Sequence, residues 1–198
     1  MFTGIVQAIG RVVLINKLQD DSMKLTIDCS DLGSDFSIGE SININGVCLT
    51  IEENRSNHLS FTAVKETLEK TNLKNLKENS LVNLERAATL TTLLGGHLVT
   101  GHIDSTSKVV KIEESSNWTL IEFHIDESYK KYLIVKGSIA INGVSLTISD
   151  IKGDSFTVNL IPQTLKETTL KQLTNGDYVN IEFDLIGKYV LNKTSGAN

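Results

Sequence analysis

The second half of this chain repeats its first half at a fixed spacing, and this repeat constrains the fold more than any other feature. The segment Asn45-Gly46-Val47-Cys48-Leu49-Thr50-Ile51 returns as Asn142-Gly143-Val144-Ser145-Leu146-Thr147-Ile148, an offset of 142 − 45 = 97 residues. The opening Phe2-Thr3-Gly4-Ile5-Val6 returns at the same offset as Val99-Thr100-Gly101-His102-Ile103. A period of this length is too long for a solenoid repeat and suits a small domain.

The repeat reaches the end of each unit, because Val82-Asn83-Leu84-Glu85 returns as Val179-Asn180-Ile181-Glu182. With 198 residues, 40% of them hydrophobic, the chain has enough apolar material for one domain or for two small ones. The repeat decides for two, and we expect homologous domains at residues 1–97 and 98–198.

Composition argues against several classes of function. The formal net charge is −5 and no cluster of Lys and Arg stands out, so no nucleic-acid surface is expected. No apolar stretch approaches the roughly 18 residues of a membrane span, and the N-terminus lacks a signal-peptide pattern. Cys29 and Cys48 are too few for a disulfide framework. We therefore expect a soluble, cytoplasmic protein with no membrane partner.

The apolar pattern predicts mainly short strands in each repeat. Asn45-Gly46 lies between two alternating apolar runs, which favours a hairpin because both residues tolerate the positive φ of a type I′ turn. The first repeat is expected to hold strands at 2–15, 25–29, 58–65 and 81–85, a hairpin at 40–53 and a helix at about 67–76. The second is expected to hold strands at 98–112, 118–125, 155–161 and 178–184, a hairpin at 137–150 and a helix at about 164–173.

Three helical signals accompany the strands. Thr164 and Glu167 have the spacing of a capping box at a helix start. A short helical connector is expected at 87–94, ended by a left-handed cap at Gly95-Gly96. In the tail, an apolar stripe at helical spacing consists of Leu185, Ile186, Tyr189 and Val190. The stripe fits either an interface with another subunit or docking on its own barrel.

Short strands with one helix per repeat favour a small antiparallel barrel, because closure removes the exposed edges of a flat sheet. The expected fold is mainly β: two tandem, homologous, six-stranded, Greek-key-like barrels with short helices and a C-terminal helix. A two-layer sandwich is the alternative.

The hairpins carry the first candidate site residues. Val47, Leu49 and Ile51 share the expected core face, so Cys48 and Thr50 point outward, as do Ser145 and Thr147 in the second repeat. Small hydrogen-bonding side chains two residues apart could hold a flat polar heterocycle against the sheet. The alternative is ordinary solvent-facing strand residues, but the same pattern follows both Asn-Gly turns.

The two repeats differ at positions that matter for chemistry. His102 stands where the first repeat has Ile5, and Ser145 stands where it has Cys48, so neither repeat alone holds the full set. A histidine can transfer protons near neutral pH, and we expect His102 to share a strand face with Thr100 and Asp104. A purely structural histidine is the alternative.

Metal and nucleotide cofactors have no visible site. His97, His102 and Asp104 could be imagined as ligands, but no cysteine cluster or helical histidine pair supports them, and we expect no metal. No phosphate loop or dinucleotide fingerprint is present, so no cofactor is expected. Lys136 and Asp184 would by default be solvated surface charges.

Taken together, four motifs resemble riboflavin synthase of the α-chain type over essentially the whole chain. They are Met1 to Val6, the hairpin at 45–50, Gly95-Gly96-His97 with Gly101-His102, and the hairpin at 142–147. The resemblance implies a duplicated lumazine-binding barrel. It also implies a cofactor-free dismutation, in which two molecules of 6,7-dimethyl-8-ribityllumazine give riboflavin and 5-amino-6-ribitylaminouracil.

The resemblance further implies a homotrimer, with each site between the N-terminal barrel of one subunit and the C-terminal barrel of the next, and with the tail helix as the trimer contact. Association with a lumazine synthase shell is left open. The motifs also resemble the lumazine and yellow fluorescent antenna proteins, which bind the chromophore without catalysis and are the alternative to an enzyme. Because Cys48, His102, Ser145 and Thr147 are present, we favour the enzyme.

Site residues follow by motif. The first pocket would consist of Gly4, Ile5, Val6, Cys48, Leu49, Thr50, Thr62, Ala63, Val64, Lys65, Glu66 and Thr67. The second would consist of Gly101, His102, Ile103, Lys136, Ser145, Leu146, Thr147, Leu160, Ile161, Pro162, Gln163, Thr164 and Leu165. His102 would assist proton transfer, Ser145 and Thr147 would position the attacking water or hydroxide, and Cys48 and Asp184 would support the adduct or shuttle protons.

Overall fold

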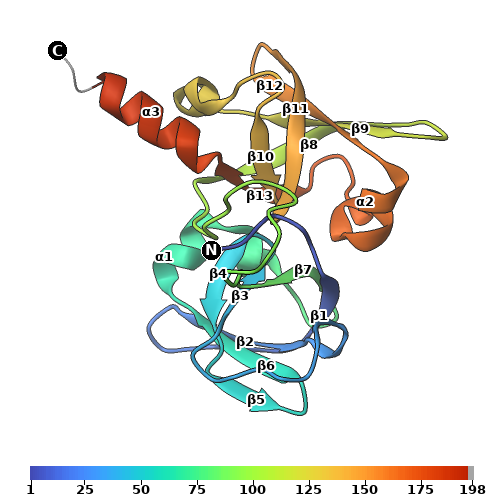
Figure 1. Ribbon diagram of the computed structural model, residues 1–198. Coiled ribbons are helices and arrows are strands. Elements are labelled where there is room, and N and C mark those ends of the chain that lie inside the picture. The colour runs from blue at the N-terminus through green and yellow to red at the C-terminus, as the bar shows by residue number, and fades with distance from the viewer. Residues whose placement is uncertain (196–198) are drawn as a thin grey trace.

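The first repeat folds into an open, barrel-like antiparallel sheet of seven strands and the second into a closed barrel, and the two barrels stand one above the other in Figure 1. A computed structural model describes residues 1–195. The first barrel, drawn in blue to green, has the strand order β4-β3-β7-β1-β2-β6-β5. Its strands are β1 (Ala8–Lys17), β2 (Met23–Asp28), β3 (Ser41–Ile44), β4 (Val47–Thr50), β5 (Glu53–Arg55), β6 (His58–Ala63) and β7 (Leu81–Arg86).

The second barrel is closed, with the order β10-β11-β12-β9-β8-β13. Its strands are β8 (Ser105–Glu114), β9 (Thr119–His124), β10 (Ser138–Ile141), β11 (Val144–Lys152), β12 (Ser155–Leu160) and β13 (Tyr178–Phe183). The single strand β11 corresponds to β4 and β5 of the first barrel, where the break at residues 51–52 leaves the ladder open. The predicted pair of barrels is confirmed, and the sandwich alternative is wrong.

The hairpin turns form as the sequence predicts. Asn45 and Gly46 have φ of 49° and 88°, and Asn142 and Gly143 have φ of 46° and 79°. Positive φ at both central residues defines a type I′ turn, whose twist matches that of the flanking strands. Side chains then alternate as expected along β4, with Val47 and Leu49 buried in the core and Cys48 and Thr50 on the outside.

Each barrel encloses its own apolar core, and each core is completed by a residue from the other repeat. Phe61 and Leu25 are fully buried in the first core, and Phe123 and Phe156 in the second. Val6 of the first repeat packs against the second core, and Ile103 of the second repeat packs against the first.

The helices begin earlier than predicted. They are α1 (Lys65–Lys70), α2 (Pro162–Glu167) and α3 (Leu185–Ser195), with 3-10 turns at Ser30–Leu32, Asn72–Asn75, Glu127–Tyr132 and Thr169–Gln172. The capping box expected at Thr164 is wrong, because α2 already starts at Pro162 with Ile161 as its N-cap. Proline suits a first helical position, since its missing N–H would have no partner there.

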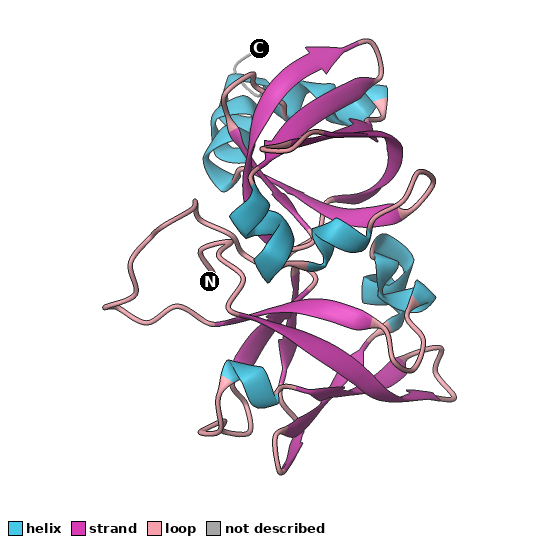
Figure 2. Ribbon diagram, turned by 90° about the vertical axis from the view of Figure 1, so that its right-hand side faces the viewer, coloured by secondary structure: helices cyan, strands magenta, loops and turns pink. Residues whose placement is uncertain are grey.

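The connector between the repeats is not helical. Residues 87–97 form turns and irregular chain that reach outward beside the N-terminus (Figure 2). Gly95 and Gly96 do not have positive φ, so the predicted left-handed cap is wrong as well. The expected strands at 2–15 and 98–112 begin only at Ala8 and Ser105, because the residues before them cross to the other barrel.

The predicted tail helix is confirmed as α3, which extends from the side of the second barrel (Figure 1). Lys188 ties it to the barrel through an ion pair of 2.8 Å with Asp104. Ile186 and Tyr189 remain 61% and 66% exposed, so the apolar stripe is only partly covered by its own chain. Among residues 1–195, no helix is long and apolar enough to cross a membrane.

Candidate functional site

Two short segments cross between the barrels and organise the candidate site. Residues 2–6 and 99–103 run antiparallel and are joined by a bridge in which Phe2 N donates to Val99 O at 2.7 Å and Val99 N donates to Phe2 O at 3.1 Å. Phe2 and Val99 are buried against Ala140. The bridge therefore anchors both segments at the junction of the two barrels.

Each crossing segment lies on the hairpin of the other repeat. Ser145 N donates to Gly4 O at 2.7 Å, and Cys48 N donates to Gly101 O at 2.9 Å. A Cβ atom on Gly4 would stand 2.6 Å from Ser145 Cβ, and one on Gly101 would stand 2.5 Å from Cys48 Cβ. Both glycines also have positive φ, of 76° and 83°. Only glycine fits at either position.

This exchange corrects the predicted grouping of the pockets. The sequence placed Gly4, Ile5 and Val6 with Cys48, and Gly101, His102 and Ile103 with Ser145. The structure reverses both assignments, because the backbone of each segment leaves its own barrel. The repeat in the sequence does not predict this crossing, because the same repeat would be seen whether each segment stayed on its own barrel or crossed to the other.

A cavity of about 350 Å³ next to Cys48 brings together six predicted site residues from three parts of the chain. They are Cys48, Glu66, Thr67, Gly101, His102 and Ile103, with Val47, Lys70 and Thr71 completing the wall. Cys48 and His102 thus line one pocket, which is formed by a hairpin, by α1 and by a crossing segment.

His102 is exposed and lies in irregular chain, so the expected strand face shared with Thr100 and Asp104 is wrong. Thr100 Oγ1 instead accepts from His102 N at 3.3 Å, and the Asp104 carboxylate turns toward Lys188. A hydrogen bond to the Thr100 hydroxyl, rather than strand pairing, thus holds the backbone at His102.

The second hairpin carries a hydroxyl–imidazole pair. His97 Nδ1 lies 2.7 Å from Ser145 Oγ, and His97 N donates to Thr3 O at 3.1 Å. Burial lowers the pKa of His97 from its ordinary value, while the negative charge of Asp184 opposes that shift. A neutral imidazole at this position can accept a proton from the serine hydroxyl.

Sequence reasoning treated His97 only as a metal ligand and missed it as a partner of Ser145. The sequence signal was the Gly95-Gly96 pair directly before His97. The structure gives the reason for Gly96, because a Cβ atom there would stand 2.3 Å from Thr3 O and 2.8 Å from Ser145 Oγ. Within residues 1–195, His97 Nε2 has no hydrogen-bond partner although it is buried.

Two glutamates that the sequence matched through the repeat, but to which it gave no role, hold the crossing segments. Glu85 Oε1 accepts from Thr3 N and Oγ1 at 2.6 and 2.7 Å, and Oε2 accepts from Gly4 N at 3.1 Å. Glu182 Oε1 accepts from Thr100 N and Oγ1 at 2.7 and 2.6 Å, and Oε2 accepts from Gly101 N at 2.9 Å. Burial raises the pKa of Glu85, and hydrogen bonds from Thr3, Gly4 and Ile5 oppose that rise.

The remaining predicted residues separate by burial. The side chains of Leu49, Ala63 and Leu160 lie inside the barrel cores, so their predicted contact with a ligand is restricted to the backbone. Val6, Ile103, Leu146 and Leu165 are partly buried and pack against those cores. The residues with an exposed or partly exposed outer surface are Ile5, Thr50, Thr62, Val64, Lys65, Lys136, Thr147, Ile161, Pro162, Gln163 and Thr164.

Two predicted charges have defined local roles. Lys136 adopts a φ of 69° in the loop before β10, where the first repeat has Gly39 at 90°. Asp184 lies between β13 and α3, where its Oδ1 accepts from Ile186 N at 3.0 Å and so caps the start of the helix. Asp184 is thereby fixed close enough to His97 for its charge to act on the imidazole.

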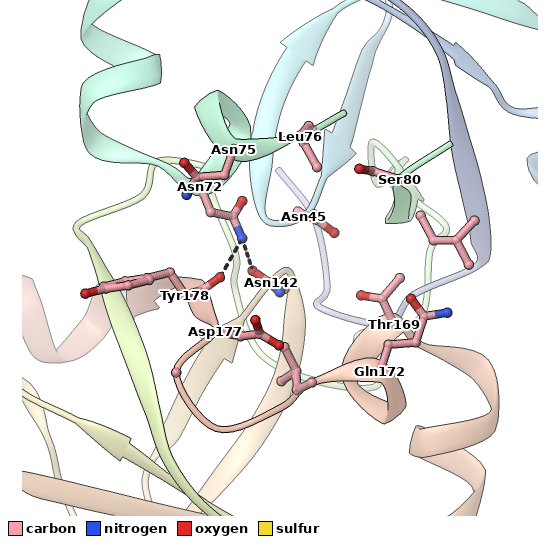
Figure 3. A pocket seen from close by; sticks show the side chains of 13 residues that line it. Asn45, Asn72, Asn75, Leu76, Ser80, Asn142, Thr169, Gln172, Asp177 and Tyr178 are labelled. Atoms are coloured by element: carbon pink, nitrogen blue, oxygen red, sulfur yellow. Dashed lines mark hydrogen bonds between the residues drawn. The ribbon is translucent and has the colours of Figure 1, made fainter. Parts of the chain in front are cut away.

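An asparagine-rich cleft of about 420 Å³ lies on the junction of the barrels (Figure 3). Asn72 Nδ2 donates to Asn142 Oδ1 and to Tyr178 O, both at 3.1 Å. Asn180 Nδ2 donates to Asn45 O at 2.8 Å, and Asn83 Nδ2 donates to Asn142 O at 2.9 Å. These bonds join each barrel to the hairpin turn of the other. Within the described chain, no group of His, Cys, Asp and Glu could hold a metal ion.

Known proteins match the chain along almost its whole length. Residues 3–87 and 100–184 each match a family described as the lumazine binding domain. The chain is 42% identical over 198 residues to the riboflavin synthase of Bacillus subtilis (strain 168), covering 100% of this chain and 92% of that protein. It is 42% identical over 185 residues to the riboflavin synthase of Escherichia coli (strain K12), covering 93% of this chain and 87% of that protein.

Solved structures match as well. LumP complexed with 6,7-dimethyl-8-(1'-D-ribityl) lumazine has a TM-score of 0.83 and 27% identity, covering 92% of this chain and 99% of that one. LumP complexed with riboflavin has a TM-score of 0.84 and 29% identity over the same shares. The matched structures thus include proteins that hold a lumazine or a flavin on this fold.

Proposed function

The chain belongs to the riboflavin synthase family with two lumazine-binding domains, and from this membership we propose that it converts two molecules of 6,7-dimethyl-8-ribityllumazine into riboflavin and 5-amino-6-ribitylaminouracil. One lumazine gives a four-carbon unit to the other. The atoms of the two substrates equal those of the two products, so the reaction requires no oxidant and no cofactor.

The observation that carries this proposal is that two similar hairpin–segment junctions carry different chemical groups. Both are formed by an Asn-Gly hairpin under a Thr-Gly segment, which suits two copies of one substrate. One carries Cys48 and His102, and the other carries Ser145 and His97. Two molecules of the same compound can therefore take different roles, one as donor and one as acceptor.

The proposed roles follow the chemistry of each side chain. His102 transfers protons in the Cys48 pocket, where its exposure gives access to a bound ring. Ser145, oriented by His97, and Thr147 position the water or hydroxide that adds to one lumazine. Cys48 and Asp184 support the adduct or move protons. Orientation of two rings in register can supply roughly 7–11 kcal/mol of the barrier reduction.

The binding surface is proposed to include the outer residues named above, from Thr62 to Thr67 beside the first pocket and from Ile161 to Leu165 beside the second, with Lys136. The repeat units are taken as 1–97 and 98–198. We further propose a cytoplasmic homotrimer in which the exposed face of α3 contacts a neighbouring subunit. Association with lumazine synthase is a separate proposal, tested by co-purification of the two proteins.

The function is tested by mixing the purified protein with 6,7-dimethyl-8-ribityllumazine alone and following both lumazine loss and riboflavin absorbance. We expect two lumazines consumed for each riboflavin formed. Tight binding with a shifted emission spectrum and no riboflavin would instead identify a chromophore-binding protein like the LumP structures, which are the reason for keeping this second candidate.

A further inference from the structure

The two buried glutamates each hold a segment that belongs to the pocket of the opposite barrel. Glu182 lies on β13 of the second barrel and is 1% exposed, while Glu85 lies on β7 of the first and is 2% exposed. The segment held by Glu182 covers Cys48 of the first barrel. The segment held by Glu85 covers Ser145 of the second.

Each carboxylate accepts hydrogen bonds from three donors of one crossing segment. Three donors converge on Glu182, namely the backbone N–H groups of Thr100 and Gly101 and the Thr100 hydroxyl. Among residues 1–195, no cation forms an ion pair with either glutamate. Burying a carboxylate without a cation is unfavourable in free energy, and hydrogen bonds from fixed donors offset that penalty.

The sheet register connects each glutamate to the pocket residue of its own barrel as well. Asn43 is paired with Cys48 on one side and with Glu85 on the other. Ala140 is paired in the same way with Ser145 and Glu182. Residues directly opposite in a ladder share a face, so a carboxylate and a pocket side chain stand in one row on each barrel. Each crossing segment spans from the carboxylate of one row to the pocket residue of the other.

We infer that Glu182 and Glu85 are positioning residues that act across the barrels: Glu182 sets His102 over Cys48, and Glu85 sets Ile5 and the Gly4 backbone over Ser145. The chain of contacts is short for Glu182, because Gly101 N is bonded to its carboxylate and His102 N to the Thr100 hydroxyl that the same carboxylate holds. This inference rests on the proposed function only for its kinetic consequences.

The substitution Glu182→Gln tests whether the Glu182 carboxylate positions the crossing segment. Glutamine has nearly the same shape but one acceptor oxygen, so its NH₂ group faces a backbone N–H and the segment loosens. Glu85→Gln is the matched control, since it makes the same chemical change at the equivalent position of the other repeat. Thr100→Val, matched by Thr3→Val, removes only the hydroxyl donor and serves as the milder pair if either glutamine variant does not fold.

Thiol reactivity tests the positioning without reference to catalysis. Cys48 is partly buried under Gly101, while Cys29 is fully buried and has a pKa raised by burial to about 12, so Cys29 is silent toward a disulfide reagent at neutral pH. We expect Glu182→Gln to raise the rate of Cys48 modification by about 5-fold or more, and Glu85→Gln to change that rate by less than about 2-fold. Equal acceleration by both variants, or none by Glu182→Gln, would overturn the inference.

Double-mutant cycles test, by kinetics, whether Glu182 acts through His102. Glu182→Gln is expected to lower kcat about 10-fold in the natural chain but less than about 2-fold when His102→Ala is already present, because the carboxylate acts through that imidazole. When Ser145→Ala is present instead, Glu182→Gln should still lower kcat about 10-fold. A purely structural role predicts the same factor in all three backgrounds, and that result would refute the inference. A natural chain that forms no riboflavin would refute the proposed function and leave the thiol result standing.

Discussion

His97 and Glu85 are buried ionisable side chains whose pKa values burial shifts in opposite directions. The pKa of His97 is lowered and that of Glu85 is raised, because burial disfavours the charged form of each. The folded protein therefore resists protonation of His97 that the unfolded chain accepts. Stability from His97 is present above its ordinary pKa of 6.5 and is lost as pH falls below that value toward the folded pKa.

The pH dependence of unfolding gives a direct check on His97. Between about pH 7.5 and 5.5 the free energy of unfolding should fall, with a slope from this group of at most about 1.4 kcal/mol per pH unit. His97→Asn should reduce that slope, as measured by urea unfolding at a series of pH values. An unchanged slope in the variant would show that other groups cause the dependence.

Gly4 and Gly101 are the residues where backbone shape limits the sequence most sharply. Gly101→Ala should cost about 2–4 kcal/mol of stability, because it combines overpacking against Cys48 with an unfavourable positive φ. Thermal and urea unfolding measure the loss. Gly187→Ala in α3 is the control, since its Cβ would meet nothing within 4 Å, and it should leave stability nearly unchanged or slightly raised.

At the scale of elements, the hairpins were predictable because their information is local. An Asn-Gly pair with positive φ and alternating apolar neighbours specifies the turn without help from the rest of the chain. The connector at 87–97 was not predictable, since its conformation depends on Thr3, Ser145 and other distant contacts. The candidate site residues differ in the same way. The motifs identified the residues, but which of them lie together depends on the crossing of residues 2–6 and 99–103, which no local pattern predicts.

The exposed face of α3 makes a prediction about assembly. If it is the subunit contact, Ile186→Asp together with Tyr189→Asp should convert the proposed trimer into monomers, as measured by light scattering after gel filtration. Val110→Asp, at an apolar position on β8 that is 47% exposed, should leave the assembly intact. A natural chain that is monomeric from the start would contradict the trimer itself.

At the scale of the whole molecule, the asparagine network determines how the barrels sit on each other. Asn180 is fully buried, and its Oδ1 accepts from Asn72 N at 2.7 Å while its Nδ2 donates to Asn45 O. Asn83 makes the equivalent pair of bonds, to Thr169 N at 2.8 Å and to Asn142 O. Only Asn180 gains a further bond, 2.9 Å to Asn72 Oδ1, because the second repeat has Thr169 where the first has Asn72.

This difference makes the network testable. Asn180→Ala should cost about 3 kcal/mol and Asn83→Ala about 2 kcal/mol, since each leaves buried backbone groups unpaired and the first breaks one bond more. Urea unfolding of both variants gives the comparison. An Asn83→Ala loss larger than that of Asn180→Ala would contradict the bond count.

The crossing of residues 2–6 and 99–103 has a consequence for how this protein can change over generations. A side chain added at Gly4 would collide with Ser145, and one added at Gly101 would collide with Cys48, so a change in one half of the gene acts on the other half. Because only glycine fits at positions 4 and 101, both positions should remain glycine in the descendants of this chain. The duplicated halves cannot diverge independently, because a segment of each half lies on the hairpin of the other.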